Sequence, residues 1–248
     1  MHSGSLLLLA LFVEVIAGTP CRGLDQTPMV TYPAAADFRV LALQSRVNWA
    51  IDGKGPSIHV YGDGRVHLHR PAVMKDSGDF EAWLTTGDLD ALLRRLAESG
   101  LFEFSPEAAR ADLVEAMKRR RDAGESAPMI TDAGTAVLII QLGSYRAVGS
   151  TEPVQDFSKV IEWSGLDFDA ETYPEVVALQ LLDCAVSVIR LLGELVQDAA
   201  IRNETMIRLP ASPVASRQLL TRGDEISCKA PKQLINCFER DCDRKNAV

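Results

Sequence analysis

The sequence lacks an excess of basic residues. It holds 26 lysines and arginines against 34 aspartates and glutamates, which gives a formal net charge of −8. A nucleic-acid interface needs a basic patch that displaces counterions from the phosphates. The one basic run, residues 118–121, ends a predicted helix, where cations complement the helix dipole. We therefore expect no nucleic-acid partner.

The sequence also lacks the short signatures of common catalytic sites. It has no Gly-x-Ser-x-Gly nucleophile elbow, no His-Glu-x-x-His zinc motif and no complete Gly-x-Gly-x-x-Gly nucleotide loop. Asp132, which precedes Ala133 and Gly134, is better explained as part of a loop that leads into a strand. We expect no catalytic residues, and the pattern favours a protein that is not an enzyme.

No hydrophobic run is long enough to cross a membrane, which takes about 20 apolar residues. Residues 6–16 have the length of a signal-peptide core, with a cleavage point after Ala17. The leader departs from the usual pattern because residues 1–5 hold no lysine or arginine and Glu14 interrupts the run. We predict a signal peptide over residues 1–17 and a secreted, periplasmic or cell-envelope chain without a transmembrane segment. The alternative is an intracellular domain that keeps its N-terminus.

The five cysteines do not form a zinc-binding pattern. Cys228, Cys237 and Cys242 are separated by nine and five positions, whereas structural zinc sites repeat a Cys-x-x-Cys pair. After export these three are candidates for disulfides, with Cys21 as a further partner, and the connectivity stays open. Cys21 also suggests a lipid anchor as an alternative localisation, although the proline before it departs from a lipobox. Cys184 lies in an apolar helical pattern, which predicts a buried small side chain.

Turn residues and composition divide the chain into segments. Prolines and a glycine indicate a linker over residues 18–36, ahead of a single domain over residues 37–202. Residues 203–248 are polar and charged, which predicts a partly disordered tail that contains three of the cysteines.

Within the domain, a period of two residues gives way to a period of 3.6. We expect strands at residues 46–51 and 80–84, hairpins at 58–69 and 135–148, and helices at 87–99, 106–121 and 173–200. Strands joined by short turns and followed by helices predict an α+β fold. The expected architecture is an antiparallel sheet built from two hairpins, with amphipathic helices packed on one face.

The first hairpin contains three of the four histidines in the chain. A three-residue loop over residues 62–64, with positive φ at Gly64, pairs Val60 with Val66, Ile58 with Leu68 and His59 with His67. This register places every apolar side chain on one face, whereas a two-residue loop would mix the faces. The other face then carries His59, Tyr61, Arg65, His67 and His69.

The histidine face suggests a metal site. His59, His67 and His69 are side by side on a rigid hairpin, and three imidazoles are a ligand set for zinc or copper. The competing interpretation is a solvated outer face of a structural hairpin, because alternation alone brings such residues together. No carboxylate that would orient the imidazoles can be assigned from the sequence.

The order of the elements resembles a group of known domains. The motifs are Tyr-Gly-Asp-Gly-Arg-Val at residues 61–66, Glu-Ser-Gly-Leu-Phe at 98–102 and Ile-Thr-Asp-Ala-Gly-Thr at 130–135, followed by a closing helix. Over residues 45–195 this resembles uncharacterised secreted bacterial α+β domains with a hairpin, helix, hairpin, helix plan. The layout also resembles that of emfourin-type inhibitors of thermolysin-like proteases, which implies an inhibitor-like role. No inhibitory motif carries over to residues of this chain.

Two functions follow as hypotheses. The first is an exported, non-enzymatic module that binds a protein or a surface ligand and needs no cofactor. The alternative is a metal-binding protein or a metal-dependent hydrolase that uses His59, His67 and His69.

Overall fold

The computed structural model describes residues 27–47, 54–126, 130 and 133–209. The expected signal peptide, Asp132 and almost all of the expected tail lie outside these residues. The disulfide candidates Cys21, Cys228, Cys237 and Cys242 lie outside them as well. The predicted α+β class is confirmed, with antiparallel sheets and helices.

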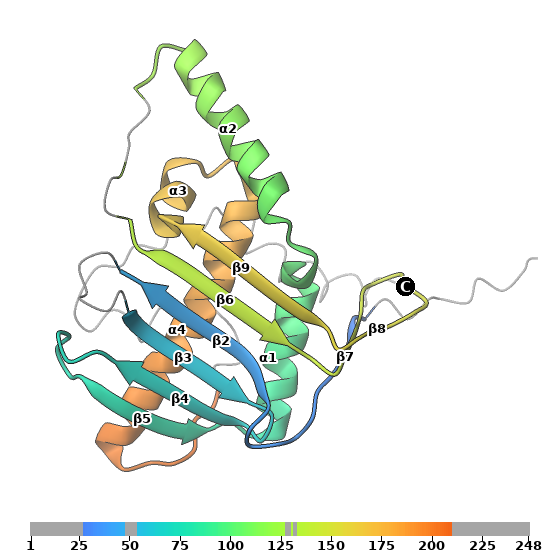
Figure 1. Ribbon diagram of the computed structural model, residues 1–248, viewed down its shortest axis with the longest axis vertical. Helices are drawn as coiled ribbons and strands as arrows, with labels where there is room; N and C mark the ends of the chain where they lie inside the picture. The colour runs from blue at the N-terminus through green and yellow to red at the C-terminus, as the bar shows by residue number, and fades with distance from the viewer. Residues whose placement is uncertain (1–26, 48–53, 127–129, 131–132, 210–248) are drawn as a thin grey trace, which may run out of the picture.

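The main sheet has six strands, each antiparallel to its neighbours, in the order β5-β4-β3-β2-β6-β9 (Figure 1). Their bounds are β2 Arg39–Arg46, β3 Lys54–Tyr61, β4 Arg65–Arg70, β5 Gly78–Trp83, β6 Thr135–Gln141 and β9 Ser158–Ser164. β2 begins earlier than the strand expected over residues 46–51, because residues 40–43 are buried on both faces of the sheet. Residues 48–51 of the expected strand lie outside the described part of the chain.

A second, smaller sheet has the order β1-β7-β8, with β1 Met29–Thr31, β7 Ser144–Arg146 and β8 Val154–Gln155. β1 falls within the stretch expected as a linker. The hairpin predicted over residues 135–148 is wrong, because β6 pairs with β2 and β9 whereas β7 pairs with β1 and β8. The amide of Leu142 donates to the carbonyl of Phe157, so the chain after β6 stays paired with the segment that precedes β9.

The helices are α1 Thr86–Glu98, a 3-10 turn η1 Leu101–Glu103, α2 Pro106–Asp122, α3 Leu166–Thr172 and α4 Val177–Arg202. α4 is the long helix predicted from residue 173, and Tyr173 and the residues after it lead into the helix. Cys184 lies in α4 and is half-buried rather than fully buried. Of the helices described, none combines the length and the apolar character needed to cross a membrane.

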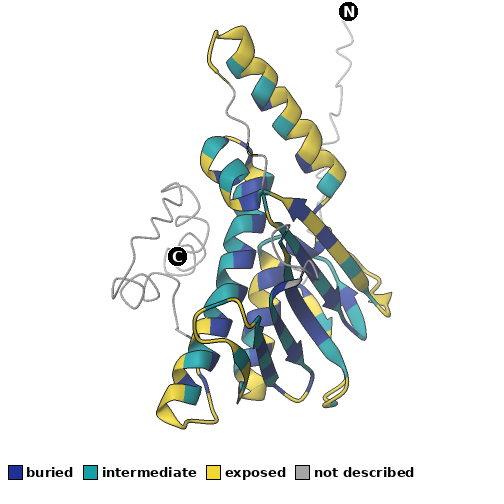
Figure 2. Cartoon of the chain, turned by 60° about the vertical axis from the view of Figure 1, so that its left-hand side comes forward, coloured by how far each residue is buried: buried dark blue, intermediate teal, exposed yellow. Residues whose placement is uncertain are grey.

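One face of the six-stranded sheet is covered by helices. α4 packs across β5, β4, β3 and β2, and α1 lies beside it on the same side (Figures 1 and 2). The predicted inward residues Ile58, Val60, Val66 and Leu68 are all buried there. Gly193 lets α4 come close, since a Cβ at this position would lie 2.9 Å from Cδ1 of Ile58. The apolar side chains that enter this layer each contribute about 1.5–3 kcal/mol when fully buried.

The turn of the first hairpin can be tested directly through Gly64. Gly64 has φ +88°, and a Cβ there would lie 2.4 Å from the carbonyl oxygen of Leu84. We expect Gly64→Ala to lower the free energy of unfolding by about 2 kcal/mol or more, because both the backbone conformation and the contact oppose a side chain. Urea unfolding followed by circular dichroism measures the change.

Gly87→Ala is the matched control. Gly87 lies in the first turn of α1, where the nearest atom to an added Cβ is 3.9 Å away. This variant should be neutral or stabilising, by up to about 1 kcal/mol. Equal losses in both variants would contradict the assignment of strain to Gly64.

Candidate functional site

The first hairpin has the register predicted from its sequence. Val60 pairs with Val66, Ile58 with Leu68 and His59 with His67. Gly64 adopts the predicted positive φ, and the Asp63 carboxylate accepts a hydrogen bond from the Arg65 amide at 3.0 Å. Because successive side chains of a strand alternate between faces, the three histidines point away from α4.

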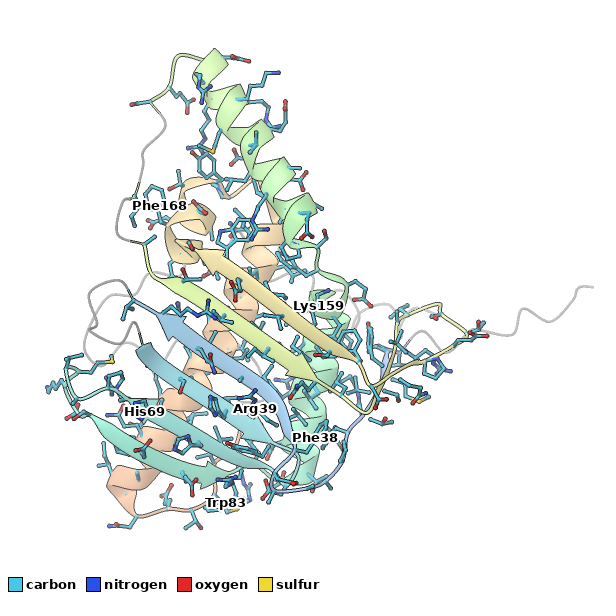
Figure 3. The ribbon with its side chains drawn as sticks, viewed as in Figure 1. Phe38, Arg39, His69, Trp83, Lys159 and Phe168 are labelled. Carbon is cyan, nitrogen blue, oxygen red and sulfur yellow. The ribbon has the colours of Figure 1, made fainter. Side chains whose placement is uncertain are left out.

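The neighbouring strands extend this polar surface. β5 places Glu81 beside His67 and Asp79 beside His69, and β2 begins with Arg39, which pairs with Tyr61. Figure 3 shows Arg39 and His69 on the side of the sheet opposite to α4. No helix that the structure describes lies on this side (Figure 1). We call the side of the six-stranded sheet opposite to α4 the open face; around the first hairpin its polar side chains are Arg39, His59, Tyr61, Arg65, His67, His69, Asp79 and Glu81.

Asp79 holds two of the histidines. Its Oδ1 lies 2.8 Å from Nδ1 of His69 and 3.2 Å from Nε2 of His67. The hydrogen bond with His69 is the main cause that lowers the pKa of the Asp79 carboxyl, and the nearby charge of both histidines acts in the same direction. Asp79 therefore stays ionised and fixes the orientation of both imidazoles.

Arg65 is held by three partners on the open face. Its guanidinium lies 4.1 Å from the centre of the Tyr61 ring, a cation–π contact. Nη1 donates to Glu81 at 2.8 Å, and Nη2 donates to the carbonyl oxygen of Ala36 at 3.0 Å. These contacts pair the charge of Arg65 with Glu81 and hold the Tyr61 ring in place.

His59 differs from the other two histidines because its Nε2 is buried and has no hydrogen-bond partner within the described structure. Its ring lies 6.1 Å from that of His67 and 6.4 Å from that of Tyr61. Burial, followed by the positive charge of Arg39, lowers the pKa of His59 to about 4. His59 is therefore neutral at physiological pH.

The structure brings the three predicted metal ligands onto one surface, but it also shows how they are engaged. His67 and His69 contact Asp79, and His59 is covered at Nε2. Within the described residues, no group of three or more histidine, cysteine, aspartate or glutamate side chains has an arrangement that could hold a metal ion. Zinc or copper binding by His59, His67 and His69 stays a prediction.

Ser57, His69 and Asp79 lie in one row across β3, β4 and β5, which is the set of groups found in serine hydrolases. Ser57 makes no hydrogen bond to His69 among the described contacts, so its hydroxyl is not activated in this arrangement. Backbone amides within a sheet are used in the ladder and do not converge on an oxyanion. The row therefore has the residue types but not the contacts of a hydrolytic site.

Sequence reasoning missed Arg39, Asp79 and Glu81. Alternation in β5 places Asp79 and Glu81 on one face, and that signal was readable. Their positions opposite His69 and His67 depend on the register between β4 and β5, which are joined by seven residues without strand structure. Arg39 was missed because β2 begins earlier than predicted.

The pKa of His59 predicts how stability depends on pH. The imidazole takes up a proton near pH 6.5 in the unfolded chain but only near pH 4 in the folded chain, so the unfolded state binds more protons between these values and stability falls as the pH is lowered through them. We expect the loss to be roughly 1–2 kcal/mol, after allowance for solvent around the half-exposed ring. His59→Phe should remove this part of the pH dependence in urea unfolding between pH 7 and pH 4.

The pH dependence of the wild-type chain must be compared with that of His59→Phe, because Asp183 changes stability with pH in the opposite direction. Burial and the charge of Asp167 raise the pKa of Asp183 to about 6, so its contribution favours the folded state at lower pH. Identical pH profiles for the wild-type chain and His59→Phe would show that His59 does not titrate as the structure implies.

In comparisons with known proteins, no family model, no curated protein and no solved structure matches the chain.

Proposed function

We propose that the chain is an exported binding module without enzymatic activity, and that its open face binds a protein partner. The observation that carries this proposal is the asymmetry of the sheet. Helices bury one face, while the other presents fixed arginine, tyrosine and histidine side chains and no described element covers it. The export of the chain is supported by the leader sequence alone.

The composition of the open face suits a protein interface. Arginine and tyrosine are enriched in interface cores, where large side chains held in place cost little entropy on binding. Arg65 and Tyr61 are held by each other and by Glu81 before a partner arrives. His67 and His69 are likewise held by Asp79. A preorganised surface loses less conformational freedom when it associates.

The size of the surface is also adequate. Six strands spaced about 4.8 Å apart, with about six residues each, project an area of roughly 500 Å². The accessible area of the side chains that stand on this projection is larger. A standard interface takes about 800 Å² from each partner. A face of this size therefore suits one protein partner.

Site-specific photo-crosslinking tests the proposal in the exporting cell. A benzophenone amino acid is introduced at His69, whose side chain is 44% exposed, or at Val160, which is 53% exposed. Both lie on the face opposite to α4, because they alternate with the buried residues Leu68 and Ile161. The control site is Val114 on α2, which is 65% exposed. We expect a discrete light-dependent adduct with another protein from positions 69 and 160 and not from position 114.

Adducts that form only from position 114, or from none of the three positions, would contradict a partner on the open face. A matched chain with the same substitutions but without illumination controls for association that is not covalent.

Elemental analysis separates the proposal from the metal alternative. Within the described residues no group of three histidine, cysteine, aspartate or glutamate side chains is arranged to hold a metal ion, and Nε2 of His59 is buried. We expect purified full-length chain to contain less than about a tenth of an equivalent of zinc or copper after dialysis, since a built site would retain its metal. One equivalent of metal that is lost in His67→Ala would overturn this expectation and favour the metal-binding function.

A further inference from the structure

Arg39 is unusual among the charged groups around the open face because it has no described ion-pair partner. Arg65 pairs with Glu81 at 2.8 Å, and Arg46, at the far end of β2, pairs with Glu162 at 3.3 Å. Asp79 is engaged by His67 and His69. The described part of the chain therefore leaves one positive charge on the open face without a counter-charge.

Two buried nitrogen atoms at Arg39 and His59 lack hydrogen bonds that a ligand could supply. Nε of Arg39 and Nε2 of His59 are both buried, and neither has a hydrogen-bond partner within the described residues. A buried polar atom without a partner is destabilising, and more so when the group is charged. Two such atoms, on adjacent strands β2 and β3, mark one place on the open face where a polar partner is missing.

The groups at Arg39 and His59 determine which charge a ligand needs in order to bind them. Arg39 is positive, and it lies close enough to His59 for its charge to act on the imidazole. Arg39 donates hydrogen bonds only, and a neutral His59 with its proton on Nε2 donates from that nitrogen. A carboxylate accepts from both, and the bond between guanidinium and carboxylate is among the stronger hydrogen bonds of proteins.

We propose that Arg39 and His59 form a receptor for a carboxylate, and that the partner of the open face inserts an aspartate or glutamate side chain there. This inference rests on the proposed function and names the chemistry of its partner. The carboxylate pairs with the guanidinium of Arg39. The same carboxylate accepts a second hydrogen bond from Nε2 of His59, which is buried in the free chain and must become accessible on binding.

The test uses hexaglutamate as an acidic probe and the full chain labelled for NMR. We expect saturable shifts of the Arg39 Nε–H signal and of the His59 ring signals, with no response to hexaglutamine. Arg39→Gln should weaken the binding by about tenfold or more, as expected for the loss of a charged hydrogen bond. Arg94→Gln, which removes the same charge from an exposed position on α1, should leave the affinity within about twofold, because a remote surface charge is screened.

Arg39→Lys keeps the positive charge and serves if Arg39→Gln does not fold. It should bind more weakly than the wild-type chain, because an ammonium lacks the planar fork of the guanidinium. His59→Phe should weaken the binding but keep part of it, because the guanidinium of Arg39 remains.

Shifts scattered over the surface, or equal affinity of Arg39→Gln and Arg94→Gln, would overturn the receptor. The two proposals fail separately. Crosslinks from positions 69 and 160 without a response at Arg39 leave a partner on the open face whose contact is not a carboxylate. A response at Arg39 without crosslinks leaves an acid-binding site and removes the protein partner.

Discussion

The packing of one sheet face against α4 is the constraint on which the rest of the structure depends. Ile58 and Leu68 enter this layer from β3 and β4, and Gly193 lets the helix backbone approach them. Since side chains alternate along a strand, this choice also decides which residues face away from α4. The histidines share a surface because their apolar neighbours share the core.

The open face is shaped by a second constraint, which is the pairing of charges. Asp79 engages two histidines, and Glu81 engages Arg65. These contacts leave most of the surface fixed and close to neutral, although the chain as a whole has a net charge of −8. Arg39 and His59 take no part in this pairing. Their buried nitrogen atoms have no described partner, and we propose that they select a carboxylate. Complementarity of this local kind sets the choice of partner more than the overall charge does.

The extent to which the sequence predicts this structure depends on the range of the interactions. The register of the first hairpin was predictable because a short turn and an alternating pattern agree. The pairing of β6 with β9 was not, since Gly143 and Ser144 look like a turn while the partner strand begins at Ser158. Asp79 was missed for the same reason: its contact with His69 depends on how β5 aligns with β4 after an irregular connection. Export and the disulfide candidates concern residues that the structure does not describe.

Histidine modification by diethyl pyrocarbonate tests the central claim most directly, because it reports whether the open face is exposed in the free chain and covered in the cell. In the purified full chain we expect His67 and His69 to react and His59 to react slowly, since its Nε2 is buried. In the exporting cell we expect His67 and His69 to be protected by the bound partner. Protection of His67 and His69 in the purified chain, or equal modification of these residues in both settings, would contradict the account.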